Sequence, residues 1–190
     1  VTARGGDRSP VTMADLERLY PIAAKRFKED EAFAQEVLRA TDELQKGRTG
    51  YKVLWKHFSD TTIRAMERDY ESLGIRFDVW LGESFYEDKM PPLVERLKKS
   101  GGAVLSEGAW VVPLEPEKPG GPEVPPLILV KSGGGFLYGT SDLATVEHRV
   151  KEFRARVSVY VVDKRQSLHF RQVFAAARKT GICPPDVDIV

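Results

Sequence analysis

The segment 157–162, Val-Ser-Val-Tyr-Val-Val, constrains the fold of this chain most strongly, because it is apolar almost throughout. Such a run is typical of a strand that is covered on both faces of a parallel sheet. Shorter apolar runs lie earlier in the chain, at residues 75–80, 103–105, 110–114 and 127–130. Helical patterns lie between or after them, at residues 91–100, 142–153 and 167–180. Strands that alternate with helices predict an α/β architecture for this part of the chain.

The first third of the chain has a different pattern, in which apolar residues recur at helical spacing in three successive stretches. Thr12 suits the N-cap of the first stretch, Gly47 ends the second and Gly74 closes the third. Three amphipathic helices with short links predict an antiparallel helical layer. A boundary between this helical part and the α/β part is therefore expected between residues 74 and 75.

Composition excludes several classes of protein. The net charge of the 190 residues is +1, so the overall charge does not indicate nucleic-acid binding. Cys183 is the only cysteine and the three histidines lie far apart, which excludes a disulfide framework and argues against a transition-metal site. No apolar run approaches the ~20 residues that a membrane-spanning helix requires.

Polar side chains follow three of the predicted strands. Glu83 lies in a Gly-Glu-Ser turn, Tyr138 and Asp142 come after the fourth apolar run, and Gln166 and His169 follow segment 157–162. Because ligands bind at the carboxyl ends of strands in open α/β sheets, these side chains are candidates for one site. Two carboxylates beside a tyrosine suit a planar cation with several donors, and a guanidinium is such a group.

Most of these residues also have a purely structural interpretation. Ser141 or Asp142 can be the N-cap of the helix that follows, and Ser167 can cap the last helix. Glu83 can cap the helix that begins after it, and a lone histidine such as His169 is more often structural than functional. The sequence alone leaves both interpretations open.

The glycine run at residues 133–135 follows Lys131 and Ser132. Three glycines after a strand can let the backbone approach a phosphate, but this spacing is neither a Walker A motif nor a dinucleotide-binding fingerprint. The favoured interpretation is a turn that pairs residues 127–130 with residues 136–138 in a β-hairpin.

Five stretches occur together in an order and spacing that is known from one family. They are Phe77-Asp78 with Gly82-Glu83-Ser84 and Tyr86, Ser106 to Ala109, Leu127 to Ser132, Tyr138 to Ala144, and Tyr160 to Phe170 with Gln172-Val173-Phe174. Through them the chain resembles the arginyl-tRNA synthetases, which are class I aminoacyl-tRNA synthetases, over nearly its whole length. The resemblance implies a partial Rossmann-like parallel sheet with a helical insertion on its N-terminal side. Residues 1–74 would be that insertion, residues 75–190 the second part of the catalytic domain, and about 103–138 a hairpin insertion in it.

The resemblance also implies roles for the candidate residues. Glu83 and Asp142 would bind the guanidinium of substrate arginine, and Tyr138 would complete the pocket. Gln166 would contact the main-chain groups of arginine, and His169 would lie on the ATP side. Lysine offers a single point charge to such a site and would leave acceptors unpaired, so the site would prefer arginine.

Beyond the pocket, the resemblance implies a parent enzyme that activates arginine with ATP and Mg²⁺ and transfers it to tRNA(Arg) in the cytoplasm, without a membrane. The 190 residues contain neither a His-x-Gly-His motif nor the signature lysine loop of class I synthetases. We therefore expect this segment alone to recognise arginine without forming arginyl-adenylate, and its catalytic residues stay unknown. Open strand edges would let such a segment dimerise.

Two other hypotheses remain open from the sequence. The chain can be a stand-alone arginine-binding paralogue without ligase activity. It can also be an unrelated nucleotide-binding α/β protein in which these turns only cap helices. A preference for arginine over lysine would separate the second hypothesis from the pocket interpretation.

Overall fold

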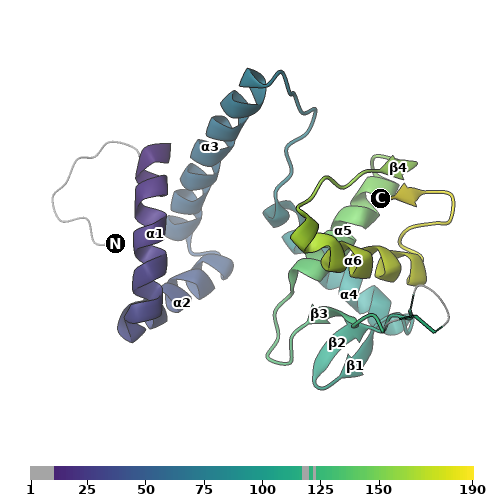
Figure 1. Ribbon diagram of the computed structural model, residues 1–190. Helices are drawn as coiled ribbons and strands as arrows, with labels where there is room; N and C mark the ends of the chain where they lie inside the picture. Colours follow the sequence, from purple (N-terminus) through teal and green to yellow (C-terminus); the bar gives the residue numbers. More distant parts are fainter. Residues whose placement is uncertain (1–10, 117–119, 122) are drawn as a thin grey trace. The chain divides into compact units, whose positions relative to one another are not determined.

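The computed structural model describes residues 11–116, 120–121 and 123–190, and the chain divides into two compact units, Val1–Val79 and Trp80–Val190 (Figure 1). The first unit is helical, and the second combines helices with two small sheets. The mixed α/β fold class predicted from the sequence is therefore confirmed.

The first unit consists of α1 (Met13–Glu29), α2 (Glu31–Gln45) and α3 (Thr49–Ser72), which contact one another. Thr12 is the N-cap of α1, as predicted, and forms a capping box with Asp15. The Asp15 amide donates to Thr12 Oγ1 over 3.3 Å, and the Thr12 amide donates to the Asp15 carboxylate over 3.1 Å. Gly47 and Gly74 follow α2 and α3 with positive φ angles of 89° and 72°, which glycine adopts without strain.

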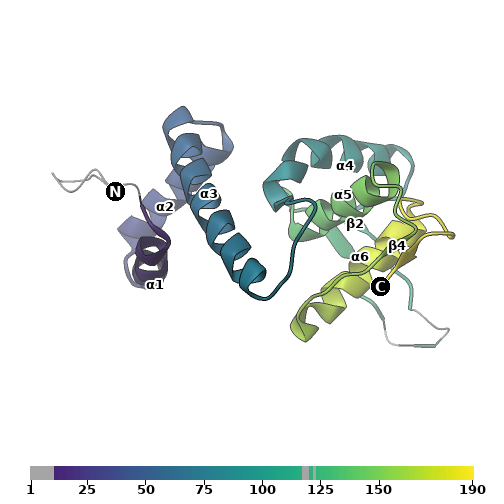
Figure 2. The ribbon, with the colours of Figure 1, turned by 90° about the horizontal axis from the view of Figure 1, so that it is seen from above.

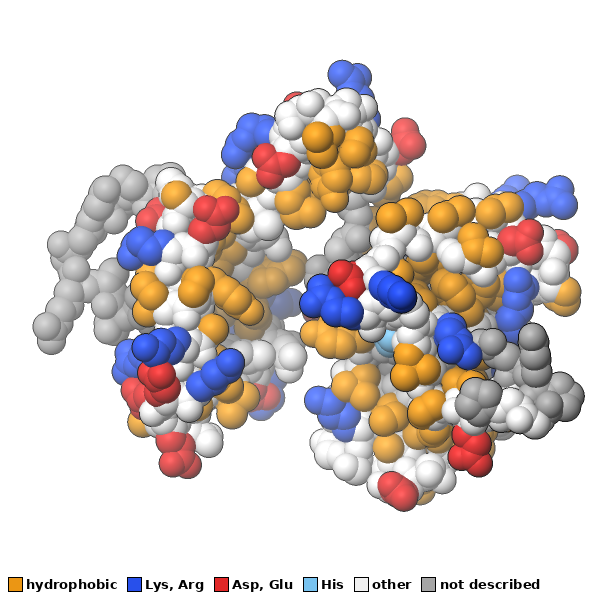
Figure 3. Space-filling view, viewed as in Figure 1, with side chains coloured by type: hydrophobic (Ala, Val, Ile, Leu, Met, Phe, Trp, Pro, Cys, Tyr) orange, Lys and Arg blue, Asp and Glu red, His pale blue; other side chains and the backbone are white. Residues whose placement is uncertain are grey.

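None of the described residues of the first unit is fully buried. Apolar side chains on all three helices keep more than a third of their surface exposed, among them Leu19, Ile22, Phe27, Leu38, Val53, Trp55 and Met66. Figure 3 shows hydrophobic side chains at the surface of this unit. The three helices therefore gain less free energy from their own packing than a unit with a buried core would.

The described residues of the second unit form three α-helices, two short 3₁₀ helices and five strands. In chain order these are η1 (Glu83–Lys89), α4 (Met90–Lys99), β1 (Val104–Ser106), β2 (Ala109–Val112), β3 (Leu127–Val130), α5 (Tyr138–Lys151), β4 (Val157–Ser158), η2 (Lys164–Gln166), α6 (Ser167–Lys179) and β5 (Asp188–Ile189). Strands β1, β2 and β3 form an antiparallel sheet in that order, and β4 pairs with β5 in parallel. Figure 2 shows α5 between α4 and α6, and α5 contacts both.

The prediction of a Rossmann-like parallel sheet is not confirmed by this structure. In segment 157–162 only Val157 and Ser158 form a strand, and Val161 is 95% exposed instead of being covered on both faces. Segment 75–80, also predicted as a strand, contains none. A strand persists only where ladder hydrogen bonds and covering side chains hold it, and β5 is the only strand that pairs with β4 in the described part of the chain.

The core of the second unit lies where α4, α5 and α6 meet β3. Its fully buried side chains include Leu93, Leu129, Leu143 and Val173. Thr140 is also fully buried, and its Oγ1 donates a 2.6 Å hydrogen bond to the Leu129 carbonyl, which ties the first turn of α5 to β3. Cys183 is 2% exposed. Burial raises the pKa of its thiol.

Glu147 joins α5 to α4 through charged contacts. Its carboxylate accepts hydrogen bonds from Arg96 Nη2 at 2.5 Å and from Lys151 Nζ at 2.6 Å, and its side chain is 17% exposed. Partial burial raises the pKa of Glu147, but the hydrogen bonds from Lys151 and Arg96 outweigh it, so the pKa lies below its usual value. The ionised form is therefore favoured in the folded state.

Replacing Glu147 with Gln is expected to lower the free energy of unfolding by about 1 kcal/mol at pH 7, because both cations lose their partner. A depressed carboxyl pKa contributes stability above the unfolded pKa, and this contribution is lost as the pH falls through the folded pKa. The difference in free energy of unfolding between wild type and E147Q, measured by urea unfolding, should thus become smaller below about pH 4. Glu123→Gln, at an exposed carboxylate, is the control; equal losses for both variants would contradict the role of the pairs.

Candidate functional site

A pocket of about 290 Å³ opens in the second unit where η1, the β3–α5 connection and the start of α5 meet. It is lined by Glu83, Ser84, Glu87, Met90, Lys131, Phe136, Leu137, Tyr138 and Ser141. Two of the residues singled out from the sequence, Glu83 and Tyr138, therefore share one cavity. They reach it from segments that are 55 positions apart in the sequence.

The 3₁₀ helix η1 presents the carboxylates of the pocket. Glu83 is its first residue, and Glu87 lies four positions further along the same element. Tyr86 is 5% exposed, and its ring contacts the rings of Phe85 and His148, at centroid distances of 5.1 and 5.7 Å. Because His148 belongs to α5, this buried tyrosine anchors η1 to α5 while Glu83 and Glu87 line the pocket.

The start of α5 places Tyr138 at the pocket. The helix begins at Tyr138, with Leu137 as its N-cap, so the predicted caps Ser141 and Asp142 both lie inside the helix. Two hydrogen bonds explain this early start, because the Leu129 carbonyl accepts from the Leu137 amide at 3.3 Å and from Thr140 Oγ1 at 2.6 Å. Tyr138 is left 68% exposed, so a ligand in the pocket can reach its side chain.

The glycine run 133–135 forms a turn, as the hairpin interpretation predicted. The Gly134 amide donates to the Lys131 carbonyl at 2.9 Å, and the Lys131 amide donates to the Gly135 carbonyl at 3.2 Å. Val130 and Phe136 then form an antiparallel bridge. The turn brings Lys131 and Phe136 to the pocket from its two arms.

Asp142 does not line this pocket, although it lies on α5 one turn after Tyr138. Its Oδ2 is 2.5 Å from Nε2 of His169, which lies in the first turn of α6. The side chains of Asp142 and His169 are 27% and 32% exposed. The structure thus brings Glu83 together with Tyr138 at the pocket, and Asp142 together with His169 one turn further along α5.

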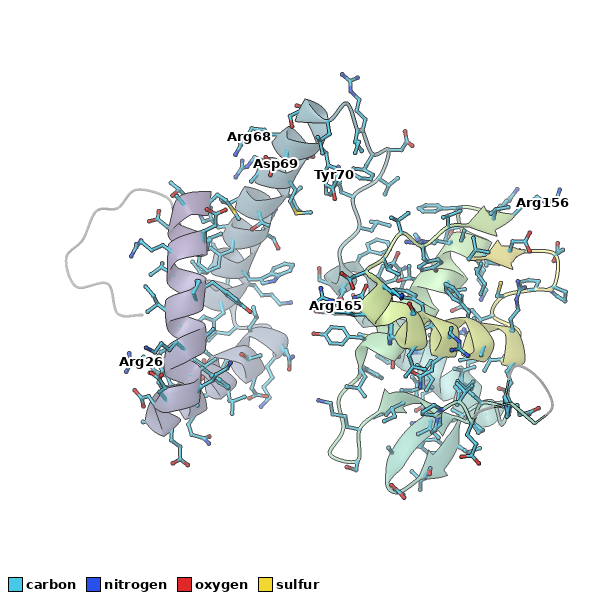
Figure 4. The ribbon with its side chains drawn as sticks, in the orientation of Figure 1. Arg26, Arg68, Asp69, Tyr70, Arg156 and Arg165 are labelled. Atoms are coloured by element: carbon cyan, nitrogen blue, oxygen red, sulfur yellow. The ribbon has the colours of Figure 1, made fainter. Side chains whose placement is uncertain are left out.

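Gln166 lies outside both pairs, in the last position of η2. Its amide donates to the Asp163 carbonyl at 2.8 Å, and its side chain is exposed. Asp163 is also held by Arg165, which Figure 4 labels, through Nε at 2.9 Å and Nη2 at 3.1 Å. Asp163, and not Ser167, caps this region, since its carboxylate accepts from the Arg165 amide and α6 itself has no side-chain cap.

The charge of the pocket favours a cation. Glu83 and Glu87 carry two negative charges, and Lys131 carries one positive charge. Carboxylates and the Tyr138 hydroxyl accept hydrogen bonds in different directions, which matches the forked donors of a guanidinium better than a single ammonium. The Ser141 hydroxyl is already committed to the Tyr138 carbonyl at 2.9 Å.

Glu87 and Lys131 are lining residues that the sequence analysis did not single out. The available signal was only that Glu87 closely follows Glu83, because in the 3₁₀ helix η1 side chains three positions apart are aligned and those four positions apart are not. Lys131 was considered only as part of the glycine-rich turn. Its approach to the pocket depends on the hairpin, which sequence spacing does not place in space.

No group of three or more His, Cys, Asp or Glu side chains within residues 11–116, 120–121 and 123–190 is arranged to hold a metal ion. Within the same ranges, every helix is too short or too polar to pass through a bilayer.

Comparisons with known proteins give consistent results. An arginine–tRNA ligase of Agathobacter rectalis is 44% identical over 182 residues, which cover 96% of this chain and 30% of that protein. One from Francisella tularensis subsp. novicida is 44% identical over 174 residues, covering 92% of this chain and 29% of the relative. The chain therefore spans slightly under a third of the length of these curated relatives.

A solved structure shares the fold. The arginyl-tRNA synthetase of Plasmodium falciparum matches 87% of this chain and 30% of its own length, with a TM-score of 0.71 and 23% identity. The family model described as tRNA synthetases class I (R), catalytic domain, matches residues 6–190. The resemblance predicted from the sequence motifs is confirmed, and the chain belongs to the class I (R) tRNA synthetase catalytic-domain family.

Proposed function

We propose that this chain is part of an arginine–tRNA ligase and carries its arginine-recognition pocket. The parent would activate arginine with ATP and transfer the aminoacyl group to tRNA(Arg). The names and 44% identity of the relatives support this assignment. The observation that carries it is the pocket in which the carboxylates of Glu83 and Glu87 lie with the Tyr138 hydroxyl.

In this proposal Glu83 and Tyr138 bind the guanidinium, with Asp142 contributing from the same face of α5. Gln166 contacts the main-chain groups of arginine, and His169 is on the ATP side. Lysine in this pocket would satisfy one acceptor and leave the others without a donor. Unpaired acceptors in a site built for hydrogen bonds account for strong discrimination between similar substrates.

The proposed parent has a Rossmann-like parallel sheet to which β4 and β5 contribute. Residues 1–74 would be its helical insertion, residues 75–190 the second part of its catalytic domain, and about 103–138 a hairpin insertion. Val159 and Val161, which follow β4 in the chain, are exposed, and further strands would add beside this segment. The same edge is where isolated copies of this segment would dimerise. We place the parent in the cytoplasm.

ATP is the second substrate in this proposal, and Mg²⁺ would accompany its phosphates. Among the described residues no group of three or more ligand side chains is arranged around a metal ion, and Mg²⁺ that is held mainly by ATP phosphates does not need one, so no residue here is assigned to it. Transition-state stabilisation of the phosphates would require groups beyond this pocket. We therefore expect the 190-residue chain alone to give no arginine-dependent pyrophosphate exchange.

Calorimetry on the full-length protein tests the pocket directly. Arginine is expected to bind at least about 100-fold more tightly than lysine, because the carboxylates and tyrosine pair with its planar donors. Agmatine, which keeps the guanidinium but lacks the carboxylate of arginine, is the matched control and should retain part of the preference. Equal affinities for arginine and lysine would reject the pocket.

Two other outcomes would favour the alternative hypotheses. Binding of ATP without any arginine binding would favour an unrelated nucleotide-binding protein. Arginine binding without pyrophosphate exchange would favour a paralogue that only binds arginine.

A further inference from the structure

A hydrogen bond between Asp142 and His169 links α5 to α6, with 2.5 Å between Oδ2 and Nε2. The two residues are 27 positions apart in the chain, so the contact depends on how the two helices pack. Both side chains are about two-thirds withdrawn from solvent. A charge-assisted hydrogen bond at such a site is stronger than one at the open surface.

Asp142 lies close to the pocket without lining it. Tyr138 and Asp142 are four positions apart on α5, so they share one face of the helix, one turn apart. Tyr138 lines the pocket and Asp142 is bound to α6. A free aspartate side chain would sample several rotamers here, whereas a carboxylate held at Oδ2 is fixed in one.

A carboxylate has more acceptor positions than one imidazole can fill. Its two oxygens accept about four hydrogen bonds, and His169 takes one of those positions at Oδ2. Oδ1 is therefore left with acceptor positions for another donor. One oxygen is thus held by a supporting residue while the other can bind a ligand. In many functional sites a supporting hydrogen bond orients the ligand-binding side chain in this way.

We propose that His169 is a positioning residue for Asp142: by holding Oδ2, it directs Oδ1 toward the guanidinium of arginine bound beside Glu83 and Tyr138. The inference rests on the proposed arginine pocket and gives His169 a role in amino-acid recognition. This role takes the place of the ATP-side role proposed for His169, because Nε2, the nitrogen that would reach outward from the ring, is bound to Asp142.

The arrangement of α6 is consistent with this role. His169 is the third residue of α6, and the ring of Phe170 lies 5.1 Å from its ring between centroids. The first turn of α6 has no side-chain cap, and the positive end of the helix dipole favours a carboxylate near it. Packing and charge thus hold the pair together from the α6 side.

A double-mutant cycle in the full-length protein tests the inference. His169→Leu removes the donor and is expected to weaken arginine binding about 5- to 10-fold, the effect of losing one hydrogen bond. In an Asp142→Asn background the same change should alter arginine affinity less than about 2-fold, because the group through which His169 acts is gone. His169→Gln, whose amide nitrogen can reach the carboxylate, should restore most of the wild-type affinity. The affinity for ATP should be the same in wild type, both single variants of the cycle, the double variant and His169→Gln.

Leu168→Ala, at an exposed neighbour in α6, is the control for the helix itself. Circular dichroism melts establish that each variant is folded. If H169L is unfolded, His169→Asn replaces it, because the asparagine amide is too short to reach the Asp142 carboxylate. The positioning role is overturned if H169L still weakens arginine binding in the D142N background. It is also overturned if H169L weakens ATP binding or tightens arginine binding. Failure of the proposed function looks different, because wild type would then bind arginine and lysine equally.

Discussion

Replacing Glu83 with Gln is expected to weaken arginine binding by the full-length protein on the order of 100-fold. The substitution keeps the shape of the side chain but removes its charge and turns one acceptor into a donor. A guanidinium presents only donors, so the new amide NH₂ group opposes it while the charge-assisted hydrogen bond is lost. Lysine should lose less affinity, since it makes fewer directed contacts. Isothermal titration calorimetry with both amino acids measures the two losses.

The matched control is Glu115→Gln, the same change at a carboxylate that is 83% exposed and pairs with Lys179 at 3.2 Å. It should leave arginine affinity unchanged. A loss of less than about 3-fold for E83Q would show that Glu83 does not touch the guanidinium. A loss that is equal for arginine and lysine would show that Glu83 acts only through the net charge of the pocket.

Replacing Gly139 with Ala is expected to destabilise the 190-residue chain by about 2 kcal/mol. A Cβ at this position would lie 2.7 Å from Leu127 Cδ1, 3.1 Å from Leu127 Cγ and 3.3 Å from the Ile128 carbonyl oxygen. Leu127 is 4% exposed and has little room to move, so the first turn of α5 must shift away from β3. Equilibrium unfolding in urea measures the loss, and Tyr138 should move with the turn.

Gly133→Ala is the control for this substitution, because a Cβ at Gly133 would meet no atom within 4 Å and its φ is not in the left-handed region. It should change the free energy of unfolding by less than about 0.5 kcal/mol. Leu127→Val combined with G139A should recover part of the loss by making space for the new methyl group. Equal stability of G139A and wild type would mean that β3 and α5 are not packed this closely.

Local signals in the sequence predicted the helices well. Thr12 before an apolar repeat marked the start of α1, and Gly47 and Gly74 marked the ends of α2 and α3, because caps and glycines act on their immediate neighbours. The start of α5 was placed four residues too late. Its true start depends on the hydrogen bond between Thr140 and the Leu129 carbonyl, a contact with β3 that no helical pattern encodes.

Strands and the site were predicted less completely, for the same physical reason. An apolar run such as 157–162 shows only that a strand is possible, whereas the pairing depends on which other segments lie beside it. For the site, the sequence identified Glu83 and Tyr138, which line one pocket. It did not identify Glu87 or Lys131, and it did not predict that Asp142 would be bound to His169.

The burial of Cys183 has a practical consequence for experiments on this chain. A thiol that is 2% exposed, with a raised pKa, has little thiolate at neutral pH and reacts slowly with maleimides and mild oxidants. Since the 190 residues contain no other cysteine, one introduced at an exposed position would be the fast-reacting group. A fluorophore could then be attached at a single chosen position without first removing the native sulfur.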